Sequence, residues 1–197
     1  MPVFLVGSSV MKFKAILLFG PSGSGKTSTA KCLDNFRGFT ALHIGERLKV
    51  MTKRNELTVK DMQAMALGKP LSVTAINLAI DQLLSQLHER NVESDILVID
   101  GPPRSIKQAE VIGKRFHILK VFLFDVPEKR LIVRLRGRYQ ELGRMDDRDE
   151  VIPSKIAEFN NVREEILRIF GLNIVVKIDP DTSPEETARL IADLVAR

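Results

Sequence analysis

A glycine-rich segment at residues 20–28 carries the clearest chemical signal in the chain. It reads GPSGSGKTS and fits the pattern G-x-x-x-x-G-K-[ST]. In such a loop, backbone N–H groups can approach an anion closely because the glycines have no Cβ. The lysine of the pattern reaches β- and γ-phosphates, and the hydroxyl after it is a ligand for Mg²⁺. The segment therefore predicts a site for a nucleoside triphosphate rather than a plain Gly/Ser turn.

The residues on either side of this segment have the character that the motif requires. Residues 15–19 (AILLF) are an uninterrupted apolar run, which predicts a buried strand. Residues 26–33 contain few helix breakers and predict a helix. The N-terminus of that helix would add its partial positive charge to the anion site. The order strand, glycine loop, helix thus favours phosphate binding.

Length and composition restrict what the protein can be. Its 197 residues suit one domain with a substantial core and are too few for two ordinary domains. The net charge of +5 and a pI near 9.4 suit an acidic partner, either a small phosphorylated molecule or a nucleic acid. The single cysteine, Cys32, excludes an internal disulfide and fits a reducing compartment.

Residues 1–13 are expected to form a loose extension. Their apolar run at 3–6 (VFLV) is too short to span a membrane, and no basic segment precedes it as in a signal peptide. Met11 could serve as an alternative start. We therefore expect a cytoplasmic protein.

Apolar runs and helical segments alternate along the rest of the chain. Residues 95–100 (DILVID) are apolar without alternation, which indicates a strand covered on both faces. Strands are also expected at 39–43, 118–124 and 174–178, and helices at 45–53, 59–67, 73–90, 105–115, 127–139, 150–170 and from 184 onward. This alternation predicts an α/β fold: a three-layer sandwich with a five-stranded parallel sheet.

Three further motifs follow the glycine segment. Residues 100–104 read DGPPR and precede QAE at 108–110; residues 124–128 read FDVPE and lead to Arg134 and Arg138; residues 144–147 read RMDD. Together with the glycine loop, they resemble the signatures of adenylate kinases and related nucleoside monophosphate kinases. The resemblance implies a single P-loop kinase domain over residues 1–197. It also implies an acceptor-binding insertion at about 44–73 and a short lid at about 137–147.

The resemblance implies a role for each charged side chain. Lys26 and Arg134 would contact the donor ATP, while Arg138 and Arg144 would come from the lid and hold the moving phosphoryl group. Arg104 would bind the acceptor phosphate, because a planar guanidinium suits an oxyanion. Taken alone, the arginines near position 134 could equally be a solvated basic face.

The expected site can be stated as four sets of residues. The catalytic residues are Lys26, Arg104, Arg134, Arg138 and Arg144. The ATP-binding residues are Gly20, Ser22, Gly23, Ser24, Gly25, Lys26, Thr27, Ser28 and Arg134. The acceptor-binding residues are Ile44, Lys49, Leu71, Arg104, Gln108, Arg144 and Lys155, with Gln108 bonding to the base. Mg²⁺ is expected at Thr27 and, through water, at Asp100.

The acceptor half departs from the family pattern. Where the family has S-T-G-D-L-L-R, residues 43–49 read HIGERLK. Ile44 replaces a threonine that lies against the adenine, and Lys49 replaces an arginine that binds the acceptor phosphate. Lys155 also stands where arginine is usual, and Pro102 replaces an aromatic residue. Lysine keeps the positive charge of arginine but cannot form its bidentate hydrogen bonds, a loss for which neighbouring Arg47 could compensate. The departures therefore bear on the specificity for AMP more than on the kinase chemistry.

We therefore expect a Mg²⁺-dependent kinase that catalyses ATP + NMP ⇌ ADP + NDP, with AMP as the first acceptor. UMP, CMP or a deoxynucleotide comes next. A different class of function, an ATP-dependent regulatory or RNA-binding module, fits the basic pI, but the retained array of cationic side chains argues against it. Phosphorylation of a non-nucleotide metabolite is a third alternative. We expect a monomer, with neither a membrane nor a nucleic acid as partner.

Overall fold

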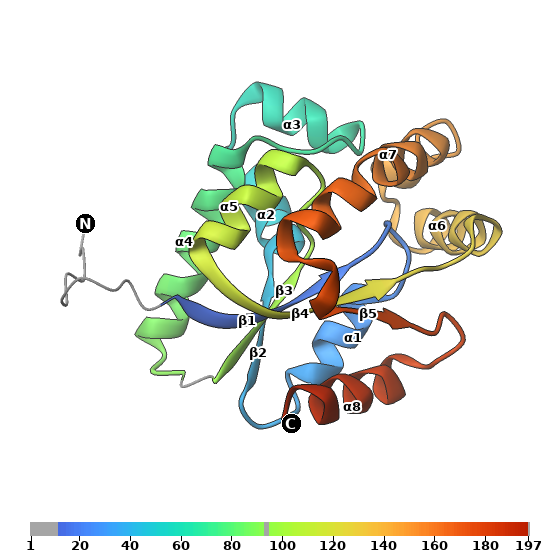
Figure 1. The fold of residues 1–197 in the computed structure, drawn as a ribbon. Coiled ribbons are helices and arrows are strands. Elements are labelled where there is room, and N and C mark those ends of the chain that lie inside the picture. The colour runs from blue at the N-terminus through green and yellow to red at the C-terminus, as the bar shows by residue number, and fades with distance from the viewer. Residues whose placement is uncertain (1–11, 93–94, 197) are drawn as a thin grey trace.

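Five parallel strands form the centre of the fold. The computed structural model describes residues 12–92 and 95–196. The strands are β1 (Phe13–Phe19), β2 (Phe39–His43), β3 (Ile96–Asp100), β4 (Phe116–Phe124) and β5 (Val175–Ile178). They lie in the order β2-β3-β1-β4-β5, and every pair is parallel (Figure 1). The expected α/β class and five-stranded parallel sheet are confirmed.

Helices cover both faces of this sheet. They are α1 (Lys26–Leu33), α2 (Ile44–Lys53), α3 (Val59–Ala66), α4 (Val73–Glu89), α5 (Ile106–Arg115), α6 (Glu128–Leu142), α7 (Ile152–Phe170) and α8 (Pro184–Val195), with short 3₁₀ helices η1 (Met145–Asp147) and η2 (Leu172–Ile174). In Figure 1, α1 and α8 lie on one side of the strands, and α4, α5 and α7 lie on the other. None of the helices in the described ranges is long and apolar enough to cross a membrane.

The side chains of β1 show how the sheet joins these layers. Successive side chains of a strand point to opposite faces. Leu17 and Phe19 pack in a core with α4, α5 and α7, whereas Ile16 and Leu18 pack in a second core with α1 and α8. All four are almost fully buried. An apolar run without alternation therefore marks a central strand between two cores.

Serine hydroxyls set the starts of three helices. Ser72 accepts a hydrogen bond from the Ala75 N–H at the start of α4, and Ser105 accepts one from the Gln108 N–H at the start of α5. Ser183 forms a reciprocal capping box at the start of α8. These caps satisfy backbone donors that the first helical turn cannot satisfy by itself.

Helix α6 is longer than the helix that the sequence predicts at 127–139. Helix α6 continues to Leu142 and ends at Gly143, which has a φ of 60° and provides a left-handed helix stop. The segment expected as the lid, about 137–147, is consequently the end of α6 followed by Gly143 and η1. The expected N-terminal extension falls mostly on residues 1–11, which lie outside the described residues; β1 begins at Phe13.

Gly101 brings the end of β3 against the start of α2. Its φ is +118°, and a Cβ on it would lie 3.0 Å from the backbone nitrogen of Gly45. Gly45 itself lacks a positive φ, and a Cβ on it would have no neighbour within 4 Å. The first turn of α2 is thus held close to the DGPPR segment.

We predict that Gly101→Ala lowers the free energy of unfolding by about 1–3 kcal/mol, because alanine is strained at this φ. Gly45→Ala is the matched control and should not destabilise the protein, since alanine favours a helix. Urea denaturation followed by circular dichroism measures both variants. A Gly101→Ala protein as stable as the parent would contradict the close approach.

Candidate active site

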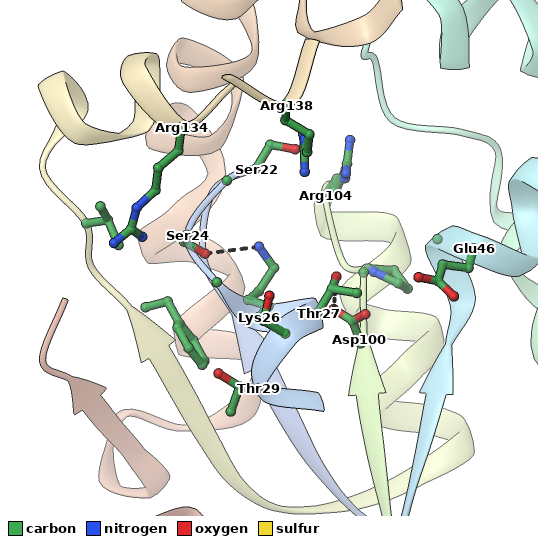
Figure 2. A pocket seen from close by; sticks show the side chains of 18 of the residues that line it. Ser22, Ser24, Lys26, Thr27, Thr29, Glu46, Asp100, Arg104, Arg134 and Arg138 are labelled. Atoms are coloured by element: carbon green, nitrogen blue, oxygen red, sulfur yellow. Dashed lines mark hydrogen bonds between the residues drawn. The ribbon is translucent and has the colours of Figure 1, made fainter. Parts of the chain in front are cut away.

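The glycine-rich loop joins β1 to α1, as predicted. A Cβ on Gly20 would lie 2.7 Å from the carbonyl oxygen of Phe124, so a larger residue could not begin the loop here. The Lys26 Nζ donates to the carbonyls of Gly20 and Pro21 at 2.7 and 2.6 Å, and to the Ser24 Oγ at 3.2 Å (Figure 2). Helix α1 has no side-chain cap, which leaves its first N–H groups available to an anion.

Burial controls the charge of Lys26. It lowers the pKa of the ammonium to about 7, against the opposing effect of the Asp100 carboxylate. The positive charges of Arg104 and Arg138 lower the pKa further. Because a nearby opposite charge favours the ionised form, a bound phosphate would raise this pKa again.

Thr27 and Asp100 place two side-chain oxygens next to each other beside the loop. The Thr27 Oγ1 donates to the Asp100 Oδ1 at 3.2 Å, and Asp100 is 3% exposed at the end of β3 (Figure 2). Mg²⁺ prefers oxygen ligands and keeps several waters, so a hydroxyl, a carboxylate and substrate phosphates fit it. Among the described residues, no group of three or more His, Cys, Asp and Glu side chains could hold a metal ion. A metal would therefore depend on water and phosphate for its other ligands.

Arginines from two further segments face the loop. Arg134 and Arg138 project from α6, and Arg104 comes from the segment after β3 (Figure 2). Arg138 donates to both Asp147 carboxylate oxygens at 2.5 and 2.8 Å, and Arg144 donates to Asp146 at 3.3 and 3.4 Å. The carboxylates keep these cations together at the cavity wall although their charges repel.

One cavity of about 810 Å³ connects these groups. Most of the predicted site residues line it, namely Ser22, Gly23, Ser24, Gly25, Lys26, Thr27, Ser28, Lys49, Leu71, Asp100, Arg104, Gln108, Arg134, Arg138 and Arg144. Besides the glycine loop, the lining residues include Lys49 of α2, Leu71 of the α3–α4 loop and Gln108 of α5. The volume of the cavity lies within the range of about 300–1,000 Å³ that small-molecule sites generally have.

Three predicted site residues do not line this cavity. Gly20 is the first residue of the loop, and its carbonyl accepts a hydrogen bond from the Lys26 ammonium. Ile44 is fully buried in the core with residues of α2 and α4. The structure therefore does not support the expected contact between Ile44 and an acceptor base, because the apolar side chain packs inward.

Lys155 is the third of these residues. Its ammonium donates to the Asp146 carbonyl and carboxylate, both at 2.8 Å, and to the Asp147 Oδ1 at 2.7 Å. Its side chain is 4% exposed. The structure thus does not support Lys155 as a direct acceptor ligand, because its three hydrogen atoms are directed into η1. It anchors the 3₁₀ helix η1, which carries the Asp146 and Asp147 carboxylates.

Gln108 lines the cavity but is 1% exposed. Its Oε1 accepts from the Arg104 N–H at 2.7 Å, and its Nε2 donates to the Leu71 carbonyl at 2.8 Å. The side chain thereby joins the backbone of Arg104 to the loop between α3 and α4. Its expected hydrogen bond to the acceptor base stays a prediction.

The β5–α8 loop is part of the cavity wall that the motifs did not indicate. Asp179, Pro180 and Thr182 line the cavity, and Asp181 pairs with Arg130 of α6. The only sequence signal for this loop was its position after β5, because the carboxyl end of β5 lies at the same sheet edge as the glycine loop. Arg47, expected to compensate for Lys49, is not among the lining residues.

Comparisons with known proteins agree with this geometry. A family model described as AAA domain matches residues 19–153. An adenylate kinase of Thermus thermophilus is 27% identical over 188 residues, which cover 92% of this chain and 97% of that protein. Adenylate kinase isoenzyme 1 of Gallus gallus is 26% identical over 176 residues, 88% of this chain and 89% of its own length. An adenylate kinase of Prochlorococcus marinus is 28% identical over 179 residues, 85% of this chain and 91% of its own length.

The η1 carboxylates predict how stability depends on pH. Burial raises the pKa of Asp147, but hydrogen bonds from Arg138 and Lys155 outweigh it and leave the pKa below its usual value. An unfolded aspartate titrates near pH 4. The stabilisation is therefore complete above about pH 4 and is lost as the pH falls through the lower folded value.

We predict that Asp147→Asn lowers the free energy of unfolding at pH 7 by about 3 kcal/mol, because it leaves buried cations without their partner. The difference between parent and variant should shrink below about pH 4. Asp149→Asn is the control, since Asp149 pairs with Arg136 in solvent and should cost less than about 1 kcal/mol. Equal stabilities at pH 7 would show that Asp147 does not hold η1.

Proposed function

Since the chain belongs to the adenylate kinase-like family of P-loop nucleoside monophosphate kinases, we propose that it transfers the γ-phosphoryl group of ATP to a nucleoside monophosphate. The proposed acceptor is AMP, in the reaction ATP + AMP ⇌ 2 ADP. One observation carries the proposal: the glycine loop and Arg104 line the same cavity, with arginines of α6 beside them.

This arrangement supports phosphoryl transfer because the reaction needs positioning and charge neutralisation more than covalent chemistry. An acceptor phosphate oxygen forms a bond to the γ-phosphorus while the bond to the β–γ bridging oxygen breaks. Lys26, Arg138 and Arg144 would stabilise the negative charge of the migrating group. Mg²⁺, held by Thr27 and through water by Asp100, would supply further charge neutralisation at the donor phosphates. An already anionic acceptor needs no general base.

The identity of the acceptor base is the finer part of the proposal. AMP is favoured because the relatives named above are adenylate kinases. UMP, CMP and deoxynucleoside monophosphates are the alternatives, because the acceptor half carries Lys49 and inward-packed Ile44. Burial and the charge of Arg144 lower the pKa of Lys49, so this lysine holds its proton less firmly than an arginine would.

An ADP-release assay coupled to NADH oxidation tests the proposal. The protein is given Mg²⁺ and ATP with AMP, UMP, CMP, GMP or dAMP in separate reactions, and without an acceptor as the control. We expect AMP to raise turnover well above ATP hydrolysis. ATP binding without acceptor-dependent turnover would overturn the kinase proposal and support an ATP-dependent regulatory module.

Lys26→Ala is predicted to lower turnover by about 10²–10³-fold, the usual cost of losing one donor that stabilises transition-state charge. Initial rates at saturating ATP and acceptor measure the loss. Lys129→Ala is the control, because Lys129 is exposed on α6 and is not among the residues that line the cavity. Turnover within a few-fold of the parent for Lys26→Ala would contradict the role of this lysine.

Arg104→Ala is predicted to reduce kcat/KM for the acceptor by about 10- to 100-fold, the value of a charged hydrogen bond in binding. The KM for ATP should change little, because the glycine loop holds the donor. Arg136→Ala removes an exposed α6 arginine that pairs with Asp149 and serves as the control. Unchanged acceptor kinetics in Arg104→Ala would place the acceptor phosphate elsewhere.

A further inference from the structure

A series of polar contacts runs from the proposed metal ligands to the end of α1. The Asp100 Oδ1 accepts from Thr27, and the Asp100 Oδ2 lies 3.3 Å from the His43 Nδ1. The His43 Nε2 lies 3.2 Å from the Asp34 Oδ2. The Asp34 Oδ1 accepts from the Ala41 N–H at 2.6 Å. Each of the two carboxylates therefore uses one oxygen for His43 and the other for a different partner.

Strand pairing explains why His43 is next to Asp100. The two residues end β2 and β3 and are partners in the parallel register. The Asp100 side chain is 4% exposed, that of His43 is 19% exposed and that of Asp34 is 39% exposed. The contacts thus lead from the buried floor of the cavity to the protein surface.

The chemistry of the three groups determines the direction of these hydrogen bonds. Ionised carboxylates only accept, so the ring nitrogen of His43 that bonds to Asp100 must carry a proton, and both ring nitrogens donate at once only in the protonated imidazole. A hydrogen bond to the Asp100 Oδ2 restricts rotation of this carboxylate and so keeps the Oδ1 in place.

We propose that His43 is a positioning residue for the metal half of the site. It holds the Asp100 Oδ2 so that the Oδ1 stays beside Thr27, and Asp34 holds the imidazole ring in turn. Groups that orient metal ligands in this way typically change metal affinity by about 10- to 100-fold when they are removed. The inference rests on the proposed function, which assigns Thr27 and Asp100 to Mg²⁺.

Four substitutions separate positioning from mere packing. His43→Asn keeps an N–H donor at the place of the Nδ1, facing Asp100. His43→Gln places its donor at the position of the Nε2, facing Asp34, and His43→Ala keeps neither. Asp34→Asn preserves the shape of the outer residue and removes its charge. Because the His43 variants share the same site, a loss confined to Gln and Ala identifies the bond to Asp100.

The readout is Mn²⁺ binding in the presence of a non-hydrolysable ATP analogue, followed by electron paramagnetic resonance. Calorimetry with ATP in EDTA measures metal-free nucleotide binding and shows that each variant is folded. We expect His43→Ala and His43→Gln to bind Mn²⁺ about 10-fold more weakly than the parent, with His43→Asn within about 3-fold of it. Asp34→Asn should weaken binding by a smaller factor, and metal-free affinity should be unchanged throughout.

His117→Ala is the control, because His117 is exposed at the start of β4, away from the carboxyl edge of the sheet. Parent-like Mn²⁺ affinity in His43→Ala would overturn the inference and leave the kinase proposal standing. If His43→Ala does not fold, equal Mn²⁺ affinities of the Asn and Gln variants would overturn it instead. A parent protein that binds no ATP would refute the proposed function itself.

Discussion

Repulsion between positive charges is the constraint on which this structure depends. Lys26, Arg138 and Arg144 line one cavity, and the fold must hold them close without letting them separate. It does so with internal acceptors: backbone carbonyls of the glycine loop for Lys26, and the η1 carboxylates for the arginines. Charge-assisted hydrogen bonds of this kind fix both position and orientation.

The parallel sheet makes this concentration of charge possible. The carboxyl ends of β1, β3 and β4 lie at one edge, so the glycine loop, the DGPPR segment and the start of α6 converge there (Figure 1). The strand interiors supply rigidity, because each central strand is packed between two apolar cores. Residues far apart in the chain can thus be held to within a hydrogen bond of their partners.

Polar side chains near the cavity act in two ways. The glycine loop and α1 present backbone and side-chain groups directly to the cavity. Gln108, by contrast, joins two loops, and Lys155 anchors η1 without lining the cavity. Lysine in place of arginine at 155 fills this compact, buried position with three hydrogen bonds. This departure from the family pattern therefore lies in the supporting framework and not among the cavity-lining residues.

The sequence alone determined the fold class, the glycine loop and most of the segments that line the cavity, the β5–α8 loop excepted. These features follow from local chemistry: β1 and β3 are apolar without alternation, and a glycine loop between a strand and a helix has one common use. Caps such as Ser72 also act within a few residues, so the helix that each begins could be predicted. Where the local signal was weaker, at the end of α6, a glycine stop decided the boundary.

Only the tertiary structure decided which polar groups meet. Nothing in residues 43–49 indicates that His43 lies between Asp34 and Asp100, because strand register brings them together. Likewise, the sequence cannot show that Ile44 points into the core or that Lys155 is held by η1. The part of the β5–α8 loop in the cavity wall was equally hidden. Motifs specify the residue types that a reaction needs, whereas packing between distant segments determines which of them face the cavity and which support it.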